Sequence, residues 1–97
     1  MSNVIAETIR KQIGSPALFM IGARDLMGFK NGFGFKLGRT PKKVNFVKIT
    51  LNGKDLYDAE YGYIRGYKYT VRTTENDLYF DMLHGSIEQN TGMLTKL

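Results

Sequence analysis

Apolar and polar residues alternate through three successive runs between Phe46 and Thr73, and glycine-containing breaks separate the runs. A period of two places alternate side chains on one face of a β-strand. The pattern therefore predicts an antiparallel β-meander that buries one face. The residues predicted to be buried are all odd-numbered: Val47, Ile49 and Leu51, then Tyr57, Ala59, Tyr61 and Tyr63, then Tyr67, Tyr69 and Val71.

The requirement to bury one face also predicts the register of the two hairpins. The first hairpin pairs Leu51 with Tyr57 around residues 52–56. The second pairs Tyr63 with Tyr67 around a three-residue loop that ends in Gly66, where a left-handed conformation is needed. Three cross-strand pairs follow from this register: Tyr61 with Tyr69, Lys48 with Glu60, and Asp58 with Arg72.

Two further strands are predicted upstream, at residues 25–30 and 33–37. They flank Asn31 and Gly32, the dipeptide that most favours a two-residue hairpin turn. Pairing Lys30 with Phe33 divides the hairpin into two faces. One face carries Leu26, Gly28, Phe33, Phe35 and Leu37, and the other carries Met27, Phe29, Gly34 and Lys36.

The N-terminal segment predicts a helix capped by Ser2 or Asn3, with an isoleucine at every fourth position as far as Ile13 and an end at Gly14. This helix should lie on the sheet, and the pattern leaves open which face it covers. Pro16 follows Ser15, a residue that can cap a helix. Residues 17–23 are apolar enough for a short buried helix or a strand, and the two alternatives stay open.

A last helix is predicted from Thr74, which forms a capping-box pattern with Asp77, and Gly92 supplies its stop. Its core face is formed by Tyr79, Met82, Leu83 and Ile87. The sequence therefore predicts a single α+β domain over residues 1–97. Its fold is a five-stranded antiparallel meander sheet flanked by an N-terminal and a C-terminal helix.

Composition narrows the functional classes. The 97 residues include no cysteine, so thiolate chemistry and disulfides are excluded. No apolar run approaches the roughly 18 residues of a membrane span, and the N-terminus lacks the apolar core of a signal peptide. We expect a cytoplasmic protein without membrane contact.

The net charge of +5 is unevenly distributed. Residues 24–54 contain eight basic residues and one acid, whereas residues 75–97 contain four acids and one lysine. Lysine and arginine bind phosphate, and exposed aromatic rings stack on bases. The candidate residues for nucleic acid or another anionic partner are Lys30, Lys36, Arg39, Lys42 and Lys43, with Phe29 and Phe46 as stacking rings. A solvated basic loop explains the same residues equally well.

The sequence gives little support for a catalytic site or a metal site. His84 lies at helical spacing from Asp77, Asp81 and Glu88, residue types that bind divalent metals, but a solvated helix face is the better interpretation. Nucleophilic catalysis would depend on this single histidine. The glycines around Gly32 lack the GK[ST] sequence of a phosphate-binding loop. We expect a non-enzymatic protein with no catalytic residues, no metal and no cofactor.

The segments KITLNGKDLYDAEYGYIRGYKYTV and DLYFDMLHGSIEQNTGMLTKL, together with RKQIGSPALFMIGARDL, cover most of the chain. They resemble a family of small uncharacterised proteins of bacteriophages, prophages and other mobile elements. The matching residues are Ile49, Thr50, Leu51, Asp55, Tyr57, Glu60, Gly66, Asp81, Thr91 and Gly92. The resemblance implies an accessory protein in a host cell that binds nucleic acid, or that binds and inhibits a host protein or defence complex. The oligomeric state stays open.

Overall fold

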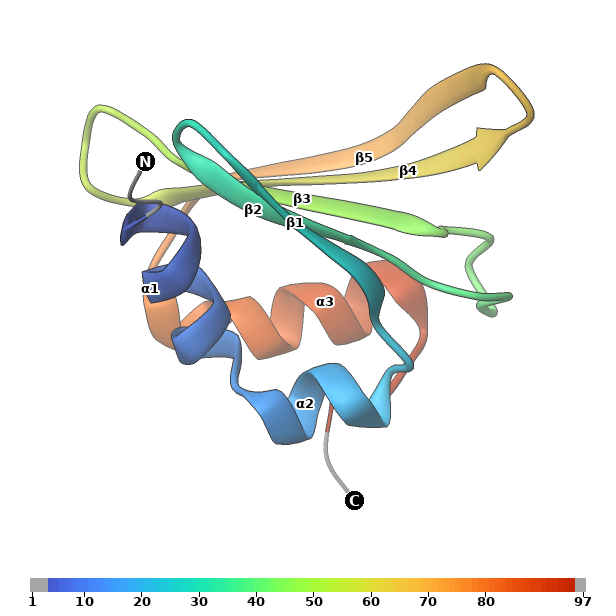
Figure 1. Ribbon diagram of the computed structural model, residues 1–97, viewed down its shortest axis with the longest axis horizontal. Helices are drawn as coiled ribbons and strands as arrows, with labels where there is room; N and C mark the ends of the chain where they lie inside the picture. The colour runs from blue at the N-terminus through green and yellow to red at the C-terminus, as the bar shows by residue number, and fades with distance from the viewer. Residues whose placement is uncertain (1–3, 96–97) are drawn as a thin grey trace.

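The computed structural model describes residues 4–95, which form an open antiparallel sheet with helices on one side (Figure 1). The strands are β1 (Arg24–Phe29), β2 (Gly32–Lys36), β3 (Phe46–Leu51), β4 (Tyr57–Arg65) and β5 (Lys68–Leu78), and their order in the sheet is the order in the chain. The helical elements are α1 (Val4–Ile13), α2 (Ser15–Met20), the 3-10 turn η1 (Phe80–Met82) and α3 (Leu83–Thr91). The predicted α+β meander is confirmed. No helix within the described range is long and apolar enough to cross a membrane.

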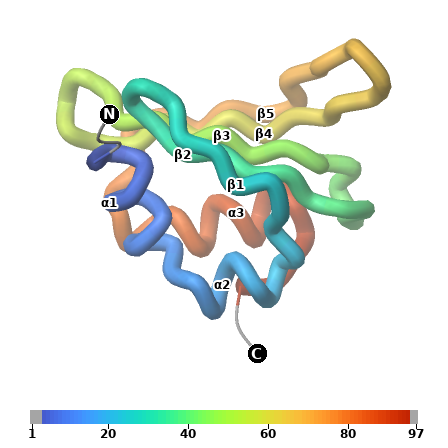
Figure 2. Tube along the Cα trace, viewed as in Figure 1, coloured from blue at the N-terminus to red at the C-terminus, as the bar shows by residue number. Residues whose placement is uncertain are grey.

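All the helices pack against the same face of the sheet, which we call the inner face (Figure 2). Ile9 and Ile13 of α1 are buried there, as the spacing of the isoleucines predicts. The predicted Ser2 or Asn3 cap lies outside the described residues. Of the segment left open, residues 17–20 are helical and residues 21–23 are not: α2 follows Gly14, whose φ of 90° turns the chain, and Pro16 lies in its first turn. Ser15 lies inside α2 and makes no side-chain cap, so that prediction is wrong.

The centre of the sheet has the predicted register. Leu51 pairs with Tyr57, and Lys48 pairs with Glu60. Val47 and Ile49 on β3, with Tyr61 on β4, are fully buried against the helices. The alternation of this region therefore reports its buried face correctly.

The β1–β2 turn differs from the prediction by one position on each strand. Its two turn residues are Lys30 and Asn31, and Phe29 pairs with Gly32. Gly32 is needed within β2, because a Cβ there would overlap the carbonyl oxygen of Ile49 on β3. The pairing moves by two residues in total, and a shift of two keeps each side chain on its predicted face of the hairpin. Leu26 keeps to this arrangement, since it lines a hollow together with Arg10 of α1 and Phe33, but on the edge strand it remains 47 % exposed.

The predicted register of the β4–β5 hairpin is wrong. Arg65 pairs with Lys68 around the two turn residues Gly66 and Tyr67, and Tyr61 pairs with Thr73 instead of Tyr69. Two register shifts each place one additional residue on β5, one of them Arg72, so Arg72 does not pair with Asp58. The two-residue turn, in place of the predicted three-residue loop, pairs odd-numbered residues of β5 with even-numbered residues of β4. Tyr69 and Val71, predicted to lie in the core, therefore share the outer face with Ile64 and Gly62 and are exposed, and Tyr67 is exposed in the turn itself.

The predicted start of the last helix is also wrong. Thr74 and Asp77 belong to β5, and α3 begins at Leu83. Strand pairing with β4 outweighs the local capping pattern. Leu83 and Ile87 are fully buried as predicted, whereas Tyr79 and Met82 precede α3 and are 60 % and 46 % exposed. The Gly92 stop is confirmed by a φ of 77°, the left-handed conformation of a helix C-cap.

Candidate nucleic-acid interface

The loop that joins β2 to β3, residues 37–45, is held in a fixed shape by its own hydrogen bonds. The buried Thr40 hydroxyl donates to the Val44 carbonyl at 2.8 Å and accepts from the Val44 amide at 2.9 Å. The Lys42 amide donates to the Thr91 carbonyl at 3.3 Å, which ties the loop to the end of α3. Lys43 has a φ of 57° and donates its amide to the Thr40 carbonyl at 3.0 Å. The basic side chains of the loop therefore project from an ordered backbone.

The β4–β5 hairpin rises beside this loop, and Asn45 joins the two. The Asn45 side-chain amide accepts from the Ile64 amide at 2.7 Å and donates to the Ile64 carbonyl at 2.9 Å, as an adjacent strand residue would. Tyr63 lies one residue earlier on the inner face of β4, and the guanidinium of Arg72 lies 5.4 Å from the centre of its ring. Asn45 thus fixes the direction in which the hairpin leaves the sheet.

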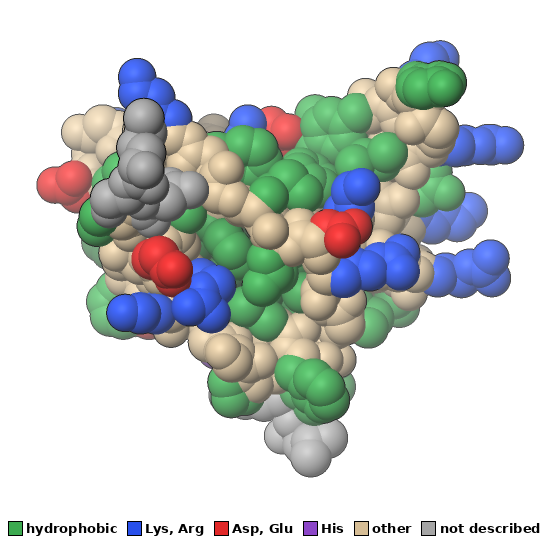
Figure 3. Space-filling model, viewed as in Figure 1, with side chains coloured by type: hydrophobic (Ala, Val, Ile, Leu, Met, Phe, Trp, Pro, Cys, Tyr) green, Lys and Arg blue, Asp and Glu red, His purple; other side chains and the backbone are tan. Residues whose placement is uncertain are grey.

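A cleft of about 570 Å³ opens between the loop and the hairpin. Its charged lining residues are Arg24, Arg39 and Lys43, and Tyr63 forms part of its wall. No acidic side chain from residues 4–95 lines it. We call this feature the basic cleft. Figure 3 shows Lys and Arg side chains gathered over this end of the molecule, on the right of the view.

The structure brings together only part of the predicted cationic set. Arg39, Lys42 and Lys43 lie in the same loop, and Lys36 precedes it at the end of β2. Lys36 is not unopposed as predicted, because its Nζ lies 3.9 Å from Asp25 Oδ2. Lys30 lies in the β1–β2 turn, at the opposite end of β2 from the loop. It therefore does not belong to the same surface.

The two predicted stacking rings lie on the outer face of the sheet and are already in contact with other side chains. Phe46 is only 9 % exposed, and Tyr69 packs edge-on against it with ring centres 5.5 Å apart. Lys48 Nζ lies 4.9 Å from the centre of the Phe29 ring. Neither ring is free to stack on a base unless these contacts open.

Sequence reasoning missed the strand residues of this end of the sheet. Arg24 reaches the cleft because β1 pairs Arg24 with Lys36, next to the loop. Arg65, Lys68 and Arg72 join the same end through the β4–β5 register. Arg24 belongs to the basic run of residues 24–54, whereas the other three lie outside that run and are brought to this end by the β4–β5 hairpin.

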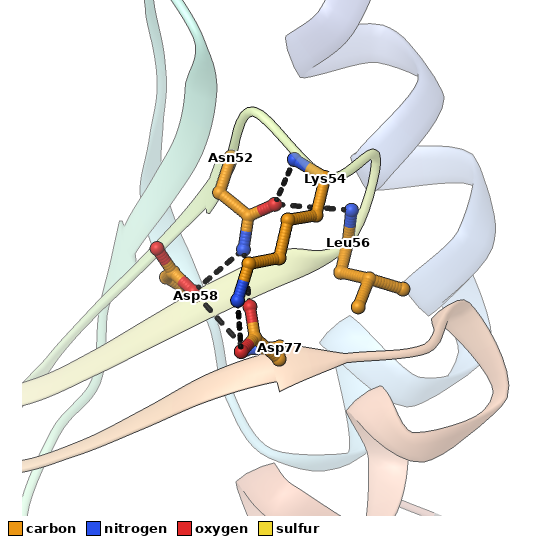
Figure 4. Close-up of polar contacts among 5 residues, drawn as sticks. All are labelled: Asn52, Lys54, Leu56, Asp58 and Asp77. Atoms are coloured by element: carbon orange, nitrogen blue, oxygen red, sulfur yellow. Dashed lines mark hydrogen bonds and ion pairs between the residues drawn. The ribbon is translucent and has the colours of Figure 1, made fainter.

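The opposite end of the sheet carries carboxylates that are bound within the protein (Figure 4). The Asn52 side-chain amide donates to Asp58 at 3.0 Å and to Asp77 at 2.9 Å, and its oxygen accepts from the Lys54 amide at 2.8 Å and the Leu56 amide at 3.2 Å. Lys54 Nζ forms an ion pair with Asp77 at 3.2 Å. This network fixes the β3–β4 turn and joins it to β5, so we assign these carboxylates a structural role.

A second polar group holds α3 on the sheet. The Ser86 hydroxyl donates to the Glu75 carboxylate, and the Tyr61 hydroxyl, 2.7 Å from Ser86 Oγ, donates to it. Asn90 also donates to Glu75, at 2.9 Å. Burial raises the pKa of the Tyr61 phenol, while the Ser86 hydrogen bond has a smaller lowering effect. Throughout residues 4–95 no buried side-chain nitrogen or oxygen lacks a partner.

The residues considered for a metal are dispersed. His84 Nε2 donates to the Ile13 carbonyl at 2.6 Å, and Asp77 belongs to β5 rather than to the helix. The Glu88 carboxylate accepts from the Thr95 amide and hydroxyl at 2.9 and 2.7 Å, so it is not simply solvated as predicted. Within the described chain no three His, Asp or Glu side chains are grouped so that they could hold a metal ion.

Comparison with known proteins gave no match to a family model, to a curated protein or to a solved structure.

Proposed function

We propose that this chain is a small non-enzymatic accessory protein that binds nucleic acid through the basic cleft, in the cytoplasm of a host cell. The observation that carries the proposal is the cleft itself: Arg24, Arg39 and Lys43 converge on it with no lining carboxylate from the described residues. Phosphate groups are the commonest ligands of such convergent cations in nucleic-acid-binding proteins. The accessory role follows from the resemblance to mobile-element proteins.

The construction of the site supports binding of an extended polyanion rather than of a small anion. The cations come from β1, the β2–β3 loop and, through Arg65 and Lys68, the hairpin beside it. A phosphate backbone presents charges in a row, which matches a row of cations better than a single pocket would. The hydrogen bonds of Thr40 and Asn45 hold the loop in place before binding. That preorganisation lowers the ordering cost of association.

Four or five phosphate contacts imply weak binding without strong sequence preference. The dissociation constant is expected at about 10⁻⁴ to 10⁻⁶ M at physiological salt. On duplex DNA, log K should fall with log salt with a slope of about −3.5 to −4.5. A binding interaction dominated by apolar contacts would respond far less to salt.

The test is an anisotropy titration of labelled oligonucleotides with a double charge reversal, Arg39→Glu with Lys43→Glu. The matched control is Lys11→Glu with Lys30→Glu, which changes the net charge equally at exposed positions on α1 and in the β1–β2 turn. The cleft variant should lose binding at low salt while its melting temperature stays close to that of the parent protein. The control should bind with a modest, uniform loss. Equal losses in both variants would show that net charge, and not the cleft, drives binding.

A second candidate function is a protein-interaction module that inhibits a host protein. It is favoured by the outer face of the sheet, which no helix of residues 4–95 covers and where Tyr69 and Val71 remain about half exposed. If the parent protein binds neither single-stranded nor double-stranded nucleic acid at low salt, the nucleic-acid proposal is wrong and this candidate takes its place.

A further inference from the structure

The outermost part of the β4–β5 hairpin, residues 63–72, extends past the rest of the sheet, and we call it the hairpin arm (Figure 1). Its strands pair with each other through Tyr63 with Thr70, Ile64 with Tyr69 and Arg65 with Lys68. On the β3 side, the last hydrogen bonds to the arm are those from the Asn45 side chain to Ile64. The arm beyond this point is held by its own pairing.

Tyr67 stands at the tip of the arm with its side chain fully exposed. The turn residue before it, Gly66, has a φ of 61°, whereas Tyr67 does not have a positive φ. This is the pattern of a type II′ turn, in which glycine occupies the first central position and the second tolerates many residues. Turn geometry therefore does not require a tyrosine here. Packing in the core does not require an aromatic ring at this position either.

The surroundings of Tyr67 point to a polyanionic ligand. The arm contains Arg65, Lys68 and Arg72 and no acidic residue. Arg65 and Lys68 are the pair that flanks the turn, so two cations come next to Tyr67 in the hairpin. Tyr63, on the inner face of the arm, has its ring next to Arg72, with 5.4 Å between the guanidinium and the ring centre. Tyr67 is thus the arm ring whose faces are open.

We propose that Tyr67 is a base-stacking residue and that the hairpin arm makes this protein prefer single-stranded over double-stranded nucleic acid. A base face is accessible to a protruding ring in a single strand, whereas in a duplex it is covered by its neighbours. The cations of the arm would contact the backbone on either side of the stacked base. This inference rests on the proposed function, because it assigns a strand preference to the same basic end of the molecule.

The test compares a 20-nucleotide oligo-dT with a 20-base-pair duplex, at one salt concentration, by anisotropy. The parent protein should bind oligo-dT more tightly than the duplex. Tyr67→Ala should weaken oligo-dT binding by about 5- to 150-fold, the range of one lost stacking contact, and leave duplex binding nearly unchanged. Tyr67→Phe keeps the ring and should bind like the parent. Tyr79→Ala, which removes another exposed tyrosine outside the arm, should also bind like the parent.

Tyrosine fluorescence supplies a second measurement, because the chain has six tyrosines and no tryptophan. Oligo-dT should quench part of the parent emission, and this quenched part should be missing in Tyr67→Phe.

The other possible results distinguish a failure of the stacking role from a failure of the proposed function. If Tyr67→Ala binds oligo-dT like the parent, or loses affinity for both probes equally, the stacking role is wrong and the cleft proposal stands. If Tyr67→Phe is as weak as Tyr67→Ala, the hydroxyl rather than ring stacking matters, and the inference is also wrong. If the parent binds neither probe at low salt, the proposed function itself is wrong, and Tyr67 becomes a candidate anchor for a protein partner.

Discussion

The phenol of Tyr61 makes a quantitative prediction about stability at alkaline pH. The side chain is fully buried between the sheet and α3, and its hydroxyl lies 2.7 Å from Ser86 Oγ. Burial raises the pKa of this phenol above its usual value of 10.0. The folded protein therefore keeps the proton at a pH at which the unfolded chain releases it.

Proton linkage gives the direction and the size of the change in stability with pH. A pKa that is higher in the folded state gives stability that is fully present below pH 10 and is lost as the pH rises from 10 towards the folded-state pKa. At pH 11, deprotonation of this one residue favours the unfolded chain by about 1.4 kcal/mol, and each further pH unit adds about the same amount while the folded phenol stays neutral.

The variant Tyr61→Phe removes this titration together with one hydrogen bond. At pH 8 it should be less stable than the parent by about 0.5 to 1.5 kcal/mol, the net contribution of a typical hydrogen bond. As the pH rises above 10, the parent should lose stability faster, and near pH 11 the two free energies of unfolding should meet or cross. Urea titrations followed by circular dichroism from pH 8 to 11.5 measure this directly.

Tyr67→Phe is the matched control, because the Tyr67 side chain is exposed in the folded state. Its stability should follow that of the parent at every pH, and lysine deprotonation affects all three proteins alike. If the free energies of Tyr61→Phe and the parent run parallel from pH 8 to 11.5, the Tyr61 hydroxyl must reach solvent in the folded state, and the packing of α3 described above is wrong.

Three other substitutions test particular contacts by their effect on the free energy of unfolding. Leu83→Ala should cost about 2 to 5 kcal/mol, since the side chain is fully buried in the core, and a cost below 1 kcal/mol in a urea titration would contradict that placement. Gly62→Ala should cost about 1 to 3 kcal/mol, because its Cβ would overlap the Tyr69 ring; in a Tyr69→Ala background the same change should be nearly silent, which a double-mutant cycle measures. Glu88→Ala should cost about 1 to 3 kcal/mol because it leaves the buried Thr95 without its carboxylate partner, and a melting curve superimposable on the parent's would refute that role.

The basic cleft was only partly predictable from the sequence, and the reason lies in how its residues are distributed. Arg39 and Lys43 come from one short loop, so a local count of charges finds them. Arg24 and Tyr63 reach the cleft from two different strands, through pairings that span the sheet. Lys30 belongs to the same run of charges, but the length of β2 separates it from the loop.

The sequence by itself determined the register at the centre of the sheet and which face of the sheet is buried. The strict alternation over β3 and the first half of β4 specifies the buried face, and the five residues 52–56 close the turn between Leu51 and Tyr57 in one register. It also determined the faces of the β1–β2 hairpin, since a shift of two residues in pairing preserves parity. Gly92 ended α3 for a local reason, its left-handed conformation.

Only the tertiary structure decided the course of β5 and the start of α3. The two-residue turn of the β4–β5 hairpin places Tyr69 and Val71 on the outer face. The register shift at Arg72 returns Thr73 to the face of Tyr61, and a bulge of this kind leaves no periodic signal in the sequence. Residues 74–78 could have opened a helix by their local pattern, but pairing with β4 holds them in the sheet. These features depend on contacts between distant segments. The same contacts bring the hairpin arm, with its exposed Tyr67, to the basic end of the molecule.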